Sequence, residues 1–472
     1  MDANSAPTRL PTQAPSPTYR RTLGGKNGGR MGRAHKEPAL KFNNICVIGL
    51  GYIGLPTAST FAAHGMRVLG VDISPRIIET LRRGDIHIHE PGLREEFQSA
   101  LQTGRITFDL QPGEADAFII AVPTPFYEGE YGEANGVKFK KADMRAVTSA
   151  AESIVPHLKK GNLVVLESTS PPRTTADLVR PILERSGLTA GRDFHLAYSP
   201  ERVLPGQILR ELIENARVIG GITPESAQAG RDLYATFVKG QIIQTDATTA
   251  EMVKLMENTY RDVNIAIANE FARLAERFGV DVWEAISIAS LHPRVKILSP
   301  GPGVGGHCIS VDPWFFVESA PDITPLIYNA RNVNDGQPHF VVELVRKALT
   351  RLEGKRIAAL GLAYKPDVDD LRESPAAEVV YLLQKEGAKV KTFEPFKVEG
   401  LPNMDCVADL DSALKDAEAI VLLVKHTEFT KLNPRELAEK TNARIVIDTV
   451  GAWKENDWRE AGFQVWRLGV GK

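Results

Sequence analysis

The sequence predicts an α/β protein in which two Rossmann-like, doubly wound domains are joined by a central helical region. Two stretches, 42–72 and 355–395, each run from an apolar strand through a turn and a helix to a second apolar strand. Between them, 249–278 has helical periodicity without glycine or proline. Strands that alternate with helices in this way predict parallel sheets with helices on both faces.

Length and composition allow several domains. The chain has 472 residues, of which 43% are apolar, enough for more than one core. We expect a basic, disordered tail over 1–40, a first α/β domain over 41–235, a central helical region over 236–335 and a second α/β domain over 336–472. The tail is rich in Pro, Thr, Gly and Arg and carries seven basic against two acidic residues.

Charge and cysteine content narrow the class of protein. With 57 Lys and Arg against 59 Asp and Glu, neither nucleic acid nor an anionic membrane is expected as a main partner. The apolar runs are shorter than the roughly 18 residues that a membrane helix needs. Three cysteines, an odd number, and no recognisable secretory leader favour a reducing, cytoplasmic setting.

The first strand–turn–helix stretch predicts a dinucleotide site. Gly49, Gly51 and Gly54 have the G-x-G-x-x-G spacing, which permits a tight turn, close approach of a pyrophosphate and close helix packing. Asp72 follows the second strand, where a carboxylate accepts ribose hydroxyls, so NAD is favoured over NADP. Arg76 lies close enough either to pair with that carboxylate or to meet a 2′-phosphate.

Polar residues follow several later strands of this domain. In a doubly wound sheet, ligands bind at the carboxyl ends of the strands, which singles out Thr124, Thr169, Glu201 and Arg202. On the long central helix, Lys254, Asn258 and Arg261 share one face. That stripe is either a solvated surface or the lining of a cleft.

The second strand–turn–helix stretch repeats the topology with different turn chemistry. Ser374 is predicted to cap a helix that starts at Pro375. The turn reads "GLAYKPD" and lacks the glycine pattern, so a second dinucleotide is not expected and another nucleotide ligand is.

Seven segments, in order along the chain, carry a resemblance to a known family. They read "GLGYIGLP", "VPTP", "ESTSPP", "SPERV", "EMVKLMENTYR", "HPRVKILSPGPGVGGHCISVDPWF" and "GLAYKPDVDDLRES". Together they resemble the UDP-glucose/GDP-mannose dehydrogenase superfamily. The resemblance implies oxidation of the C6 alcohol of a nucleotide sugar to a carboxylate with two NAD+, in a homodimer or a higher homo-oligomer. No metal is implied.

The resemblance also assigns roles by position. Cys308 corresponds to the nucleophile, Lys254 to the proton-transferring lysine, and Asn258 and Asp312 to the oxyanion-holding and water-organising partners. Thr169 and Glu201 correspond to residues that position or activate the hydrolytic water. The expected cofactor contacts are Gly49, Gly51, Tyr52, Ile53, Gly54, Asp72, Arg76, Thr124, Thr169 and Arg372. The expected sugar-nucleotide contacts are Arg202, Val203, Lys254, Asn258, Arg261, His292, Arg294, Gly305, Tyr364 and Lys365, of which the arginine at 294 is expected to reach a neighbouring subunit's site.

The chemistry explains why a cysteine is needed. Oxidation of an alcohol to an acid removes four electrons, so an aldehyde must be held between two hydride transfers, and a covalent intermediate does this. A Cys308 thiolate can trap the aldehyde as a thiohemiacetal, which a second hydride loss converts to a thioester. We therefore expect Lys254 to depress the pKa of this thiol.

One position bears on the substrate. UDP-glucose dehydrogenases usually carry a lysine before the loop aspartate, where this chain has Val311, and the loop is similar to the branch that oxidises UDP-N-acetylhexosamines. The expected substrate is UDP-N-acetyl-D-mannosamine, with UDP-N-acetylglucosamine or UDP-glucose as alternatives. A two-electron dehydrogenase and a catalytically silent sugar-nucleotide sensor remain as rival functions. The number of NADH molecules formed per sugar separates the three: two for the four-electron enzyme, one for the two-electron enzyme and none for the sensor.

Overall fold

A computed structural model describes residues 42–88, 90–204, 206–306, 308–396 and 404–471. They belong to a single unit that extends from Leu40 to Lys472. The tail predicted over 1–40 lies outside the described residues.

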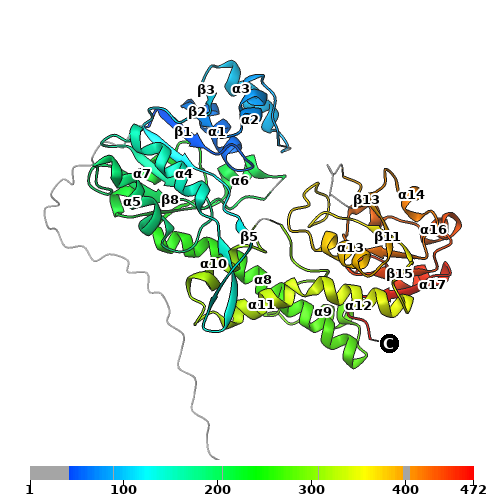
Figure 1. Cartoon of the computed structure of the whole chain (residues 1–472). Coiled ribbons are helices and arrows are strands. Elements are labelled where there is room, and N and C mark those ends of the chain that lie inside the picture. Colours follow the sequence, from blue (N-terminus) through cyan, green and yellow to red (C-terminus); the bar gives the residue numbers. More distant parts are fainter. Residues whose placement is uncertain (1–41, 89, 205, 307, 397–403, 472) are drawn as a thin grey trace, which may run out of the picture. The chain divides into compact units, whose positions relative to one another are not determined.

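The first sheet confirms the predicted doubly wound domain (Figure 1). Its strands lie in the order β10 (Ile242–Asp246), β9 (Arg217–Gly221), β8 (His195–Tyr198), β7 (Leu163–Leu166), β4 (Ala117–Ile120), β1 (Asn44–Ile48), β2 (Arg67–Val71), β3 (Ile106–Asp109). All neighbours are parallel except β8 and β9, which pair antiparallel. The helices between these strands are α1 (Gly54–Ala63), α2 (Pro75–Arg82), α3 (Leu93–Gln102), α4 (Arg145–Ile154), α5 (Arg180–Leu183), α6 (Ile208–Glu214) and α7 (Pro224–Tyr234), with short helical turns η1 (Val155–His157), η2 (Thr175–Val179) and η3 (Glu184–Ser186).

Both faces of this sheet are buried, which explains why its strands read as continuous apolar runs. Along β1, Ile45 and Val47 belong to one core cluster with Phe61 of α1. Cys46 and Ile48 belong to another with Val147 of α4. The alternation is the two-residue period of a strand, so neighbouring residues pack under helices on opposite faces.

A β-hairpin interrupts the domain and was not predicted, although its Asn135-Gly136 turn, with φ positive at both residues, is a local signal for one. Strands β5 (Phe126–Ala134) and β6 (Val137–Ala142) pair antiparallel, outside the main sheet. None of their residues is fully buried and many are charged, so these strands do not read as the continuous apolar runs of the main sheet. The backbone amide of Ala142 donates to the Glu318 carboxylate (3.0 Å), which ties the hairpin to helix α10 (Asp312–Ser319).

The predicted central helix is present as α8 (Ala247–Phe278), capped by Asp246, whose side chain accepts from the Thr249 amide. Ala250, near its start, packs in the core of the first sheet, and Ala272, near its end, packs in the core of the second. Helices α9 (Val282–Ala289), α10 and α11 (Pro325–Asp335) follow.

The second sheet confirms the other Rossmann-like domain, and all its strands are parallel. They lie in the order β13 (Asp405–Cys406), β12 (Lys389–Phe393), β11 (Arg356–Leu360), β14 (Ala419–Leu422), β15 (Ile445–Asp448), β16 (Gln464–Arg467). Its helices are α12 (Gln337–Leu349), α13 (Pro375–Lys385), α14 (Leu410–Leu414), α15 (Thr427–Thr430), α16 (Pro434–Lys440) and α17 (Glu455–Glu460). Ser374 caps α13 as predicted, accepting from the Ala377 amide (3.3 Å).

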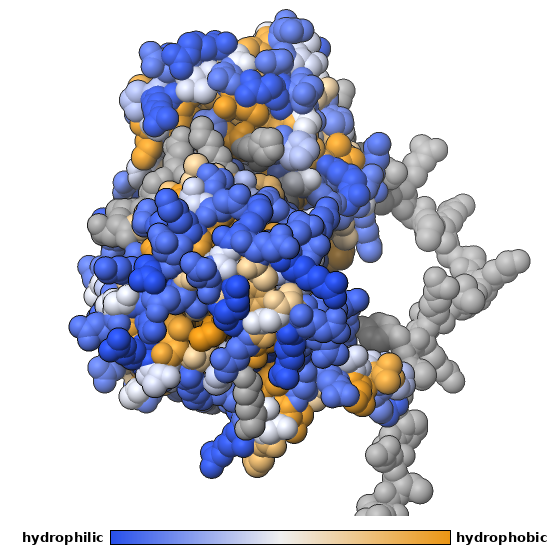
Figure 2. Space-filling view, turned by 90° about the vertical axis from the view of Figure 1, so that its right-hand side faces the viewer, coloured by the Kyte–Doolittle hydropathy of each residue, from blue (hydrophilic) through white to orange (hydrophobic). Residues whose placement is uncertain are grey.

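The surface is mixed in character. On the face seen in Figure 2, hydrophilic residues dominate and apolar residues form smaller groups between them. Across the described ranges, no helix has the length and apolar character needed to cross a membrane.

Candidate active site

The glycine turn after β1 has the geometry that its spacing predicts. Gly49 has φ +92°, and a Cβ there would lie 2.5 Å from the Ala121 carbonyl oxygen. A Cβ on Gly54 would lie 1.7 Å from the Gly49 carbonyl oxygen, so only glycine lets α1 start this close to the turn. A Cβ on Gly51 would meet nothing within 4 Å. The exposed middle of the turn is therefore open to a ligand, while its two ends are tightly packed.

Asp72 lies beside this turn, directly after β2. Its carboxylate accepts from the amides of Leu50 (3.0 Å) and Ser74 (2.9 Å). Such bonds fix the carboxylate at the strand end where ribose hydroxyls are bound in this fold. Arg76 is exposed on α2. The turn, the helix start behind it and the placed carboxylate fit an adenine dinucleotide.

Two other predicted strand-end residues lie together. The Thr124 hydroxyl donates to the carbonyl oxygen of Thr169 (2.6 Å), which links the loops after β4 and β7. A residue that the sequence did not reveal, Glu251 of α8, holds the segment after Thr169. Its buried carboxylate accepts from the amides of Arg173 (2.5 Å) and Thr175 (2.8 Å).

Lys254, Asn258 and Asp312 form a buried polar group on one face of α8. The Asn258 amide donates to the Asp312 carboxylate (2.5 Å). Burial raises the pKa of Asp312 from 3.8 to about 6, although the positive charge of Lys254 and the Asn258 bond both lower it. Of the predicted stripe, Lys254 is therefore buried in the site and Asn258 is half-buried, whereas Arg261 is exposed.

Cys308 precedes α10 and is solvent-accessible, although many protein atoms crowd around it. Its carbonyl oxygen accepts from the amides of Val311 (3.0 Å) and Asp312 (2.8 Å), so the cysteine is tied to the start of the helix. The pKa of the thiol is raised, first by desolvation and then by the Asp312 carboxylate, whereas Lys254 and Arg372 lower it. The expected depression is thus wrong for the protein without ligands, because desolvation outweighs the two cations.

The glycines before Cys308 fit against the turn of the second domain. A Cβ on Gly305 would lie 2.4 Å from the Glu373 carbonyl oxygen, and one on Gly306 would lie 2.7 Å from the Tyr364 ring. The Gly306 amide donates to the Arg372 carbonyl oxygen (3.0 Å). These two glycines therefore let the cysteine loop pack closely against the turn of the second domain.

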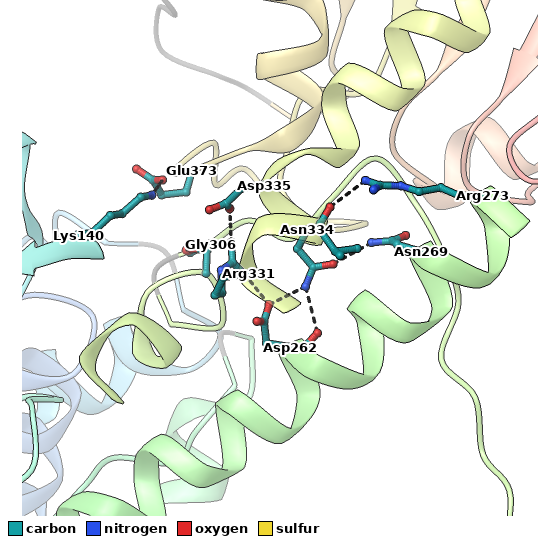
Figure 3. A network of polar contacts seen from close by, with 11 residues as sticks. Lys140, Asp262, Asn269, Arg273, Gly306, Arg331, Asn334, Asp335 and Glu373 are labelled. Atoms are coloured by element: carbon teal, nitrogen blue, oxygen red, sulfur yellow. Dashed lines mark hydrogen bonds and ion pairs between the residues drawn. The ribbon is translucent and has the colours of Figure 1, made fainter. Parts of the chain in front are cut away.

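A buried network anchors the start of the same loop (Figure 3). Asp262 of α8 accepts from Arg331 and from Asn334 (2.8 Å), both on α11. The Asn334 side-chain oxygen accepts from the Asn269 amide group (2.9 Å), and the Asn269 side-chain oxygen accepts from the Gly301 backbone amide (3.0 Å). The chain of bonds therefore fixes α11 and the cysteine loop to α8.

Three predicted sugar-nucleotide contacts act on one another electrostatically. Desolvation first, and then the Arg261 charge, lower the pKa of Lys365. Burial raises the pKa of Tyr364 to about 12, with a contribution from Cys308, while Arg261 opposes the rise. Two cations thus converge beside a phenol near the thiol, an arrangement that favours an anionic ligand.

The turn of the second domain has a carboxylate that is buried and held by protein. At the strand end that corresponds to Asp72, Glu394 accepts from the amides of Leu362 (2.7 Å) and Ala363 (3.0 Å). Both Glu394 and its neighbour His426 are buried, with Glu394 Oε1 3.1 Å from His426 Nε2. Burial and the His426 contact thus distinguish Glu394 from Asp72, which is only half-buried beside its turn.

The remaining predicted residues have the following places. Arg372 bonds to Asp370 (2.6 Å) and its guanidinium lies 5.3 Å from the Tyr52 ring, beside the glycine turn. Arg202 pairs with Glu257 of α8, and Val203 packs half-buried on the first core. Ile53 is the residue before α1, and His292 and Arg294 are exposed after α9. In the described ranges, no group of three or more His, Cys, Asp or Glu side chains could hold a metal ion.

Family models match almost all of the folded chain. The NAD binding domain of the UDP-glucose/GDP-mannose dehydrogenase family matches residues 43–238, its central domain 248–336 and its UDP binding domain 358–455. The chain belongs to the UDP-glucose/GDP-mannose dehydrogenase family. It is an NAD-dependent UDP-sugar dehydrogenase, and NAD is its cofactor.

Relatives and solved structures of this family cover nearly the whole chain. UDP-N-acetyl-D-mannosamine dehydrogenase of Methanococcus maripaludis is 46% identical, over 90% of this chain and 97% of the relative. NDP-N-acetyl-D-galactosaminuronic acid dehydrogenase of Ralstonia solanacearum is 47% identical, over 88% and 97%. The structure of UDP-D-ManNAc dehydrogenase from Pyrococcus horikoshii superposes with a TM-score of 0.83 at 40% identity, covering 91% and 99%. A UDP-glucose dehydrogenase structure from Pyrobaculum islandicum gives 0.76 at 29% identity, covering 94% and 100%.

The glycine turn of the dehydrogenase predicts different effects for two alanine substitutions. Gly54→Ala should lower the melting temperature of the ligand-free enzyme by several degrees, because overpacking costs about 1–3 kcal/mol or more. Gly51→Ala should leave that temperature unchanged and weaken NAD+ binding, measured by calorimetry. Wild-type affinity in Gly51→Ala would show that the pyrophosphate does not lie against this turn.

The raised pKa of Asp312 predicts a pH-dependent stability. At pH values between 3.8 and about 6, the folded enzyme keeps a proton on Asp312 that the unfolded chain has lost. This group's contribution therefore falls as pH rises through that window and stays lower above it. The melting temperature of the wild type minus that of Asp312→Asn should decrease between about pH 4 and about pH 7. A difference that is constant with pH would contradict the shift.

Proposed function

We propose that the enzyme oxidises the C6 alcohol of UDP-N-acetyl-D-mannosamine to the carboxylate, in four electrons, through a covalent intermediate on Cys308. The observation that carries this is the placement of an accessible cysteine within the electrostatic reach of Lys254, Asp312, Tyr364 and Arg372. A two-electron dehydrogenase needs no thiol at this place. A catalytically silent sensor needs neither the thiol nor the charged side chains around it.

The choice of sugar is supported by the relatives and by one loop position. UDP-N-acetyl-D-mannosamine dehydrogenases are similar to this chain over nearly their whole length, at 43–47% identity. Val311, where UDP-glucose dehydrogenases usually carry lysine, is buried against Leu255 and Phe315. An apolar residue there leaves no ammonium beside Asp312 from this side of the loop.

Lys254, Asn258 and Cys308 would carry out the oxidation steps. NAD+, which the glycine turn after β1 and Asp72 would hold, would supply a hydride acceptor for carbon 6 of the sugar, and two molecules would be used for each sugar. Lys254, as the neutral amine, takes the hydroxyl proton and becomes the ammonium, and the Cys308 sulfur then adds to the aldehyde carbon to give a thiohemiacetal. Lys254 and Asn258 stabilise the oxyanion in both oxidation steps.

Hydrolysis would use the residues at the strand ends. Water adds to the thioester carbon, the carbon–sulfur bond breaks, and the proton of the water passes to Glu201, with Thr169 and Asp312 helping to place the water. The products are the acid and the Cys308 thiolate. The raised thiol pKa means that the thiolate forms more readily as pH rises, and Lys254 and Arg372 favour it.

The sugar nucleotide would be held between α8 and the second domain. Desolvation and then the Arg261 charge lower the pKa of Lys365 while Asp370 and Glu90 oppose them, and a pyrophosphate beside the two cations would add to that opposing effect. The exposed residues His292 and Arg294 stand apart from this group in sequence and would act in a neighbouring subunit's site. In this proposal, residues 41–235 form the NAD-binding domain, 236–335 the central region that pairs subunits and 336–472 the domain that binds the sugar nucleotide.

A second copy of the chain would cover one face of α8. Apolar side chains of this helix are exposed at four- and three-residue intervals, which places them in one stripe. They are Met256, Tyr260, Ile267, Phe271, Leu274 and Phe278. Lys254, Asn258 and Arg261 lie on the opposite face by the same periodicity, so pairing along the stripe leaves the site on the other side. The stripe supports a homodimer or a higher oligomer. We place this assembly in the cytoplasm, where its uronic acid product would serve polysaccharide synthesis.

A panel of nucleotide sugars tests the substrate. NADH release should be fastest, by kcat/KM, with UDP-N-acetyl-D-mannosamine and at least about tenfold slower with UDP-N-acetylglucosamine, UDP-N-acetylgalactosamine and UDP-glucose. A preference for UDP-N-acetylgalactosamine would instead place the enzyme with the Ralstonia relative. Fastest turnover of UDP-glucose would contradict the assignment to N-acetylhexosamines.

Replacement of the nucleophile tests the covalent route. Cys308→Ser should abolish acid formation and leave NAD+ and UDP-sugar binding nearly intact, because serine keeps the shape of the side chain but is a much weaker nucleophile. Cys406→Ser, which changes another exposed thiol, is the matched control and should retain normal activity. More than a few per cent of wild-type acid production in Cys308→Ser would exclude the covalent route.

A further inference from the structure

A buried charged cluster lies behind Glu201, and no step above uses it. Arg217, the first residue of β9, donates to the Glu201 carboxylate (2.6 Å) and lies 3.4 Å from the Glu167 carboxylate. The side chains of Arg217, Glu201 and Glu167 are 4%, 9% and 0% exposed. One arginine thus joins the residue after β7 to the residue in the loop after β8.

The arginine is fixed on its other sides as well. Its guanidinium lies 4.3 Å from the centre of the Tyr234 ring, and it donates to the Ser199 hydroxyl (3.1 Å). The Tyr234 hydroxyl in turn donates to Glu167 (2.6 Å). A planar guanidinium with a ring on its face and acceptors at its edge has one available orientation.

Stability alone does not account for this cluster. Buried ion pairs pay a desolvation penalty that often exceeds their attraction, and apolar residues of similar size are frequently as good. Here two carboxylates share one arginine. Burial, with Glu201 adding to it and Arg217 opposing it, raises the pKa of Glu167 to about 7.

Glu201 is held from two directions. Arg217 binds one carboxylate oxygen, and the backbone amide of Arg202 donates to the other (2.7 Å). Each oxygen keeps a second lone pair, so the carboxylate is fixed in place and can still accept from water. The Arg202 guanidinium is not part of this hold, because it pairs with Glu257.

We propose that Arg217 is a positioning residue for hydrolysis of the thioester, holding Glu201 toward the attacking water, and that Glu167 and Tyr234 hold Arg217. This inference rests on the proposed function, since it assumes the Cys308 thioester. In that step water forms a bond to the thioester carbon, its proton passes to Glu201, and the Cys308 sulfur leaves with the electron pair. Arg217 touches no reacting atom, so its loss should slow only this step.

Arg217→Met tests the proposal by separating the two halves of the reaction. After rapid mixing with UDP-N-acetyl-D-mannosamine and NAD+, we expect the first two hydride transfers at near wild-type rate. Steady-state turnover should then be slower by about tenfold to a hundredfold, because a misplaced catalytic group costs that much. Intact mass should show one sugar nucleotide bound to the enzyme, and the bound form should disappear when Cys308 is also replaced.

Three further variants calibrate that result. Glu201→Gln should accumulate the same adduct. Arg217→Lys keeps the charge but loses the forked donor geometry, so it should show a smaller slowing in the same direction. Arg331→Met is the matched control, because it removes another fully buried arginine, from the α8–α11 network. This control should slow the hydride transfers and the thioester hydrolysis together and should accumulate no adduct on Cys308.

The outcomes separate failure of this inference from failure of the proposed function. If no variant shows an adduct on Cys308 and Cys308→Ser still forms the acid, the covalent route fails. If Glu201→Gln accumulates the adduct and Arg217→Met turns over normally, or slows all steps as Arg331→Met does, the positioning role alone is overturned. If Arg217→Met does not fold, Arg217→Lys decides: adduct accumulation supports the role, and normal turnover overturns it.

Discussion

The structure depends on one constraint, the unbroken course of α8 from the core of one sheet into the core of the other. A 32-residue helix spans about 48 Å, and this one has Ala250 packed near its start and Ala272 packed near its end. Because a helix is rigid over such a length, side chains on its middle turns have fixed positions relative to both packed ends. The same holds for Lys254 and Asn258, which lie one and two turns after Ala250, and the cysteine loop is bonded back to the same helix through Asn269.

Around that helix, the site contains charged and ionisable side chains whose burial alone would be unfavourable, and their mutual attraction offsets part of that cost. Desolvation raises the pKa of Cys308 and of Asp312, while the Lys254 charge opposes both shifts. In a low-dielectric setting each such charge acts strongly on its neighbours, which is what stabilisation of an oxyanion requires. Glu251 on the same helix caps the loop that follows Thr169, so α8 positions the strand-end loops as well as the nucleophile.

Local patterns in the sequence predicted much of the fold and part of the site. The glycine turn, the Ser374 cap and the long helix follow from short-range rules, and each is present. The antiparallel pairing of β8 with β9 and the buried network do not, because they depend on contacts between residues far apart in the chain. The hairpin is local, and its Asn135-Gly136 turn was a signal that the prediction missed. Arg217 gave one local signal, a charge opening a fully buried strand, but its partners come from β7 and α7 and no local pattern names them. The direction of the Cys308 pKa shift was mispredicted for a similar reason, since desolvation depends on the packed surroundings.

The central claim is that one site carries out two successive oxidations on a sugar that stays bound between them. The most direct measurement is the amount of NADH formed per UDP-N-acetyl-D-mannosamine when the sugar is limiting, together with the identity of the product by mass spectrometry. The account predicts two NADH per sugar and the uronic acid as the only product. One NADH per sugar with a released aldehyde, or no NADH from any nucleotide sugar, would contradict it.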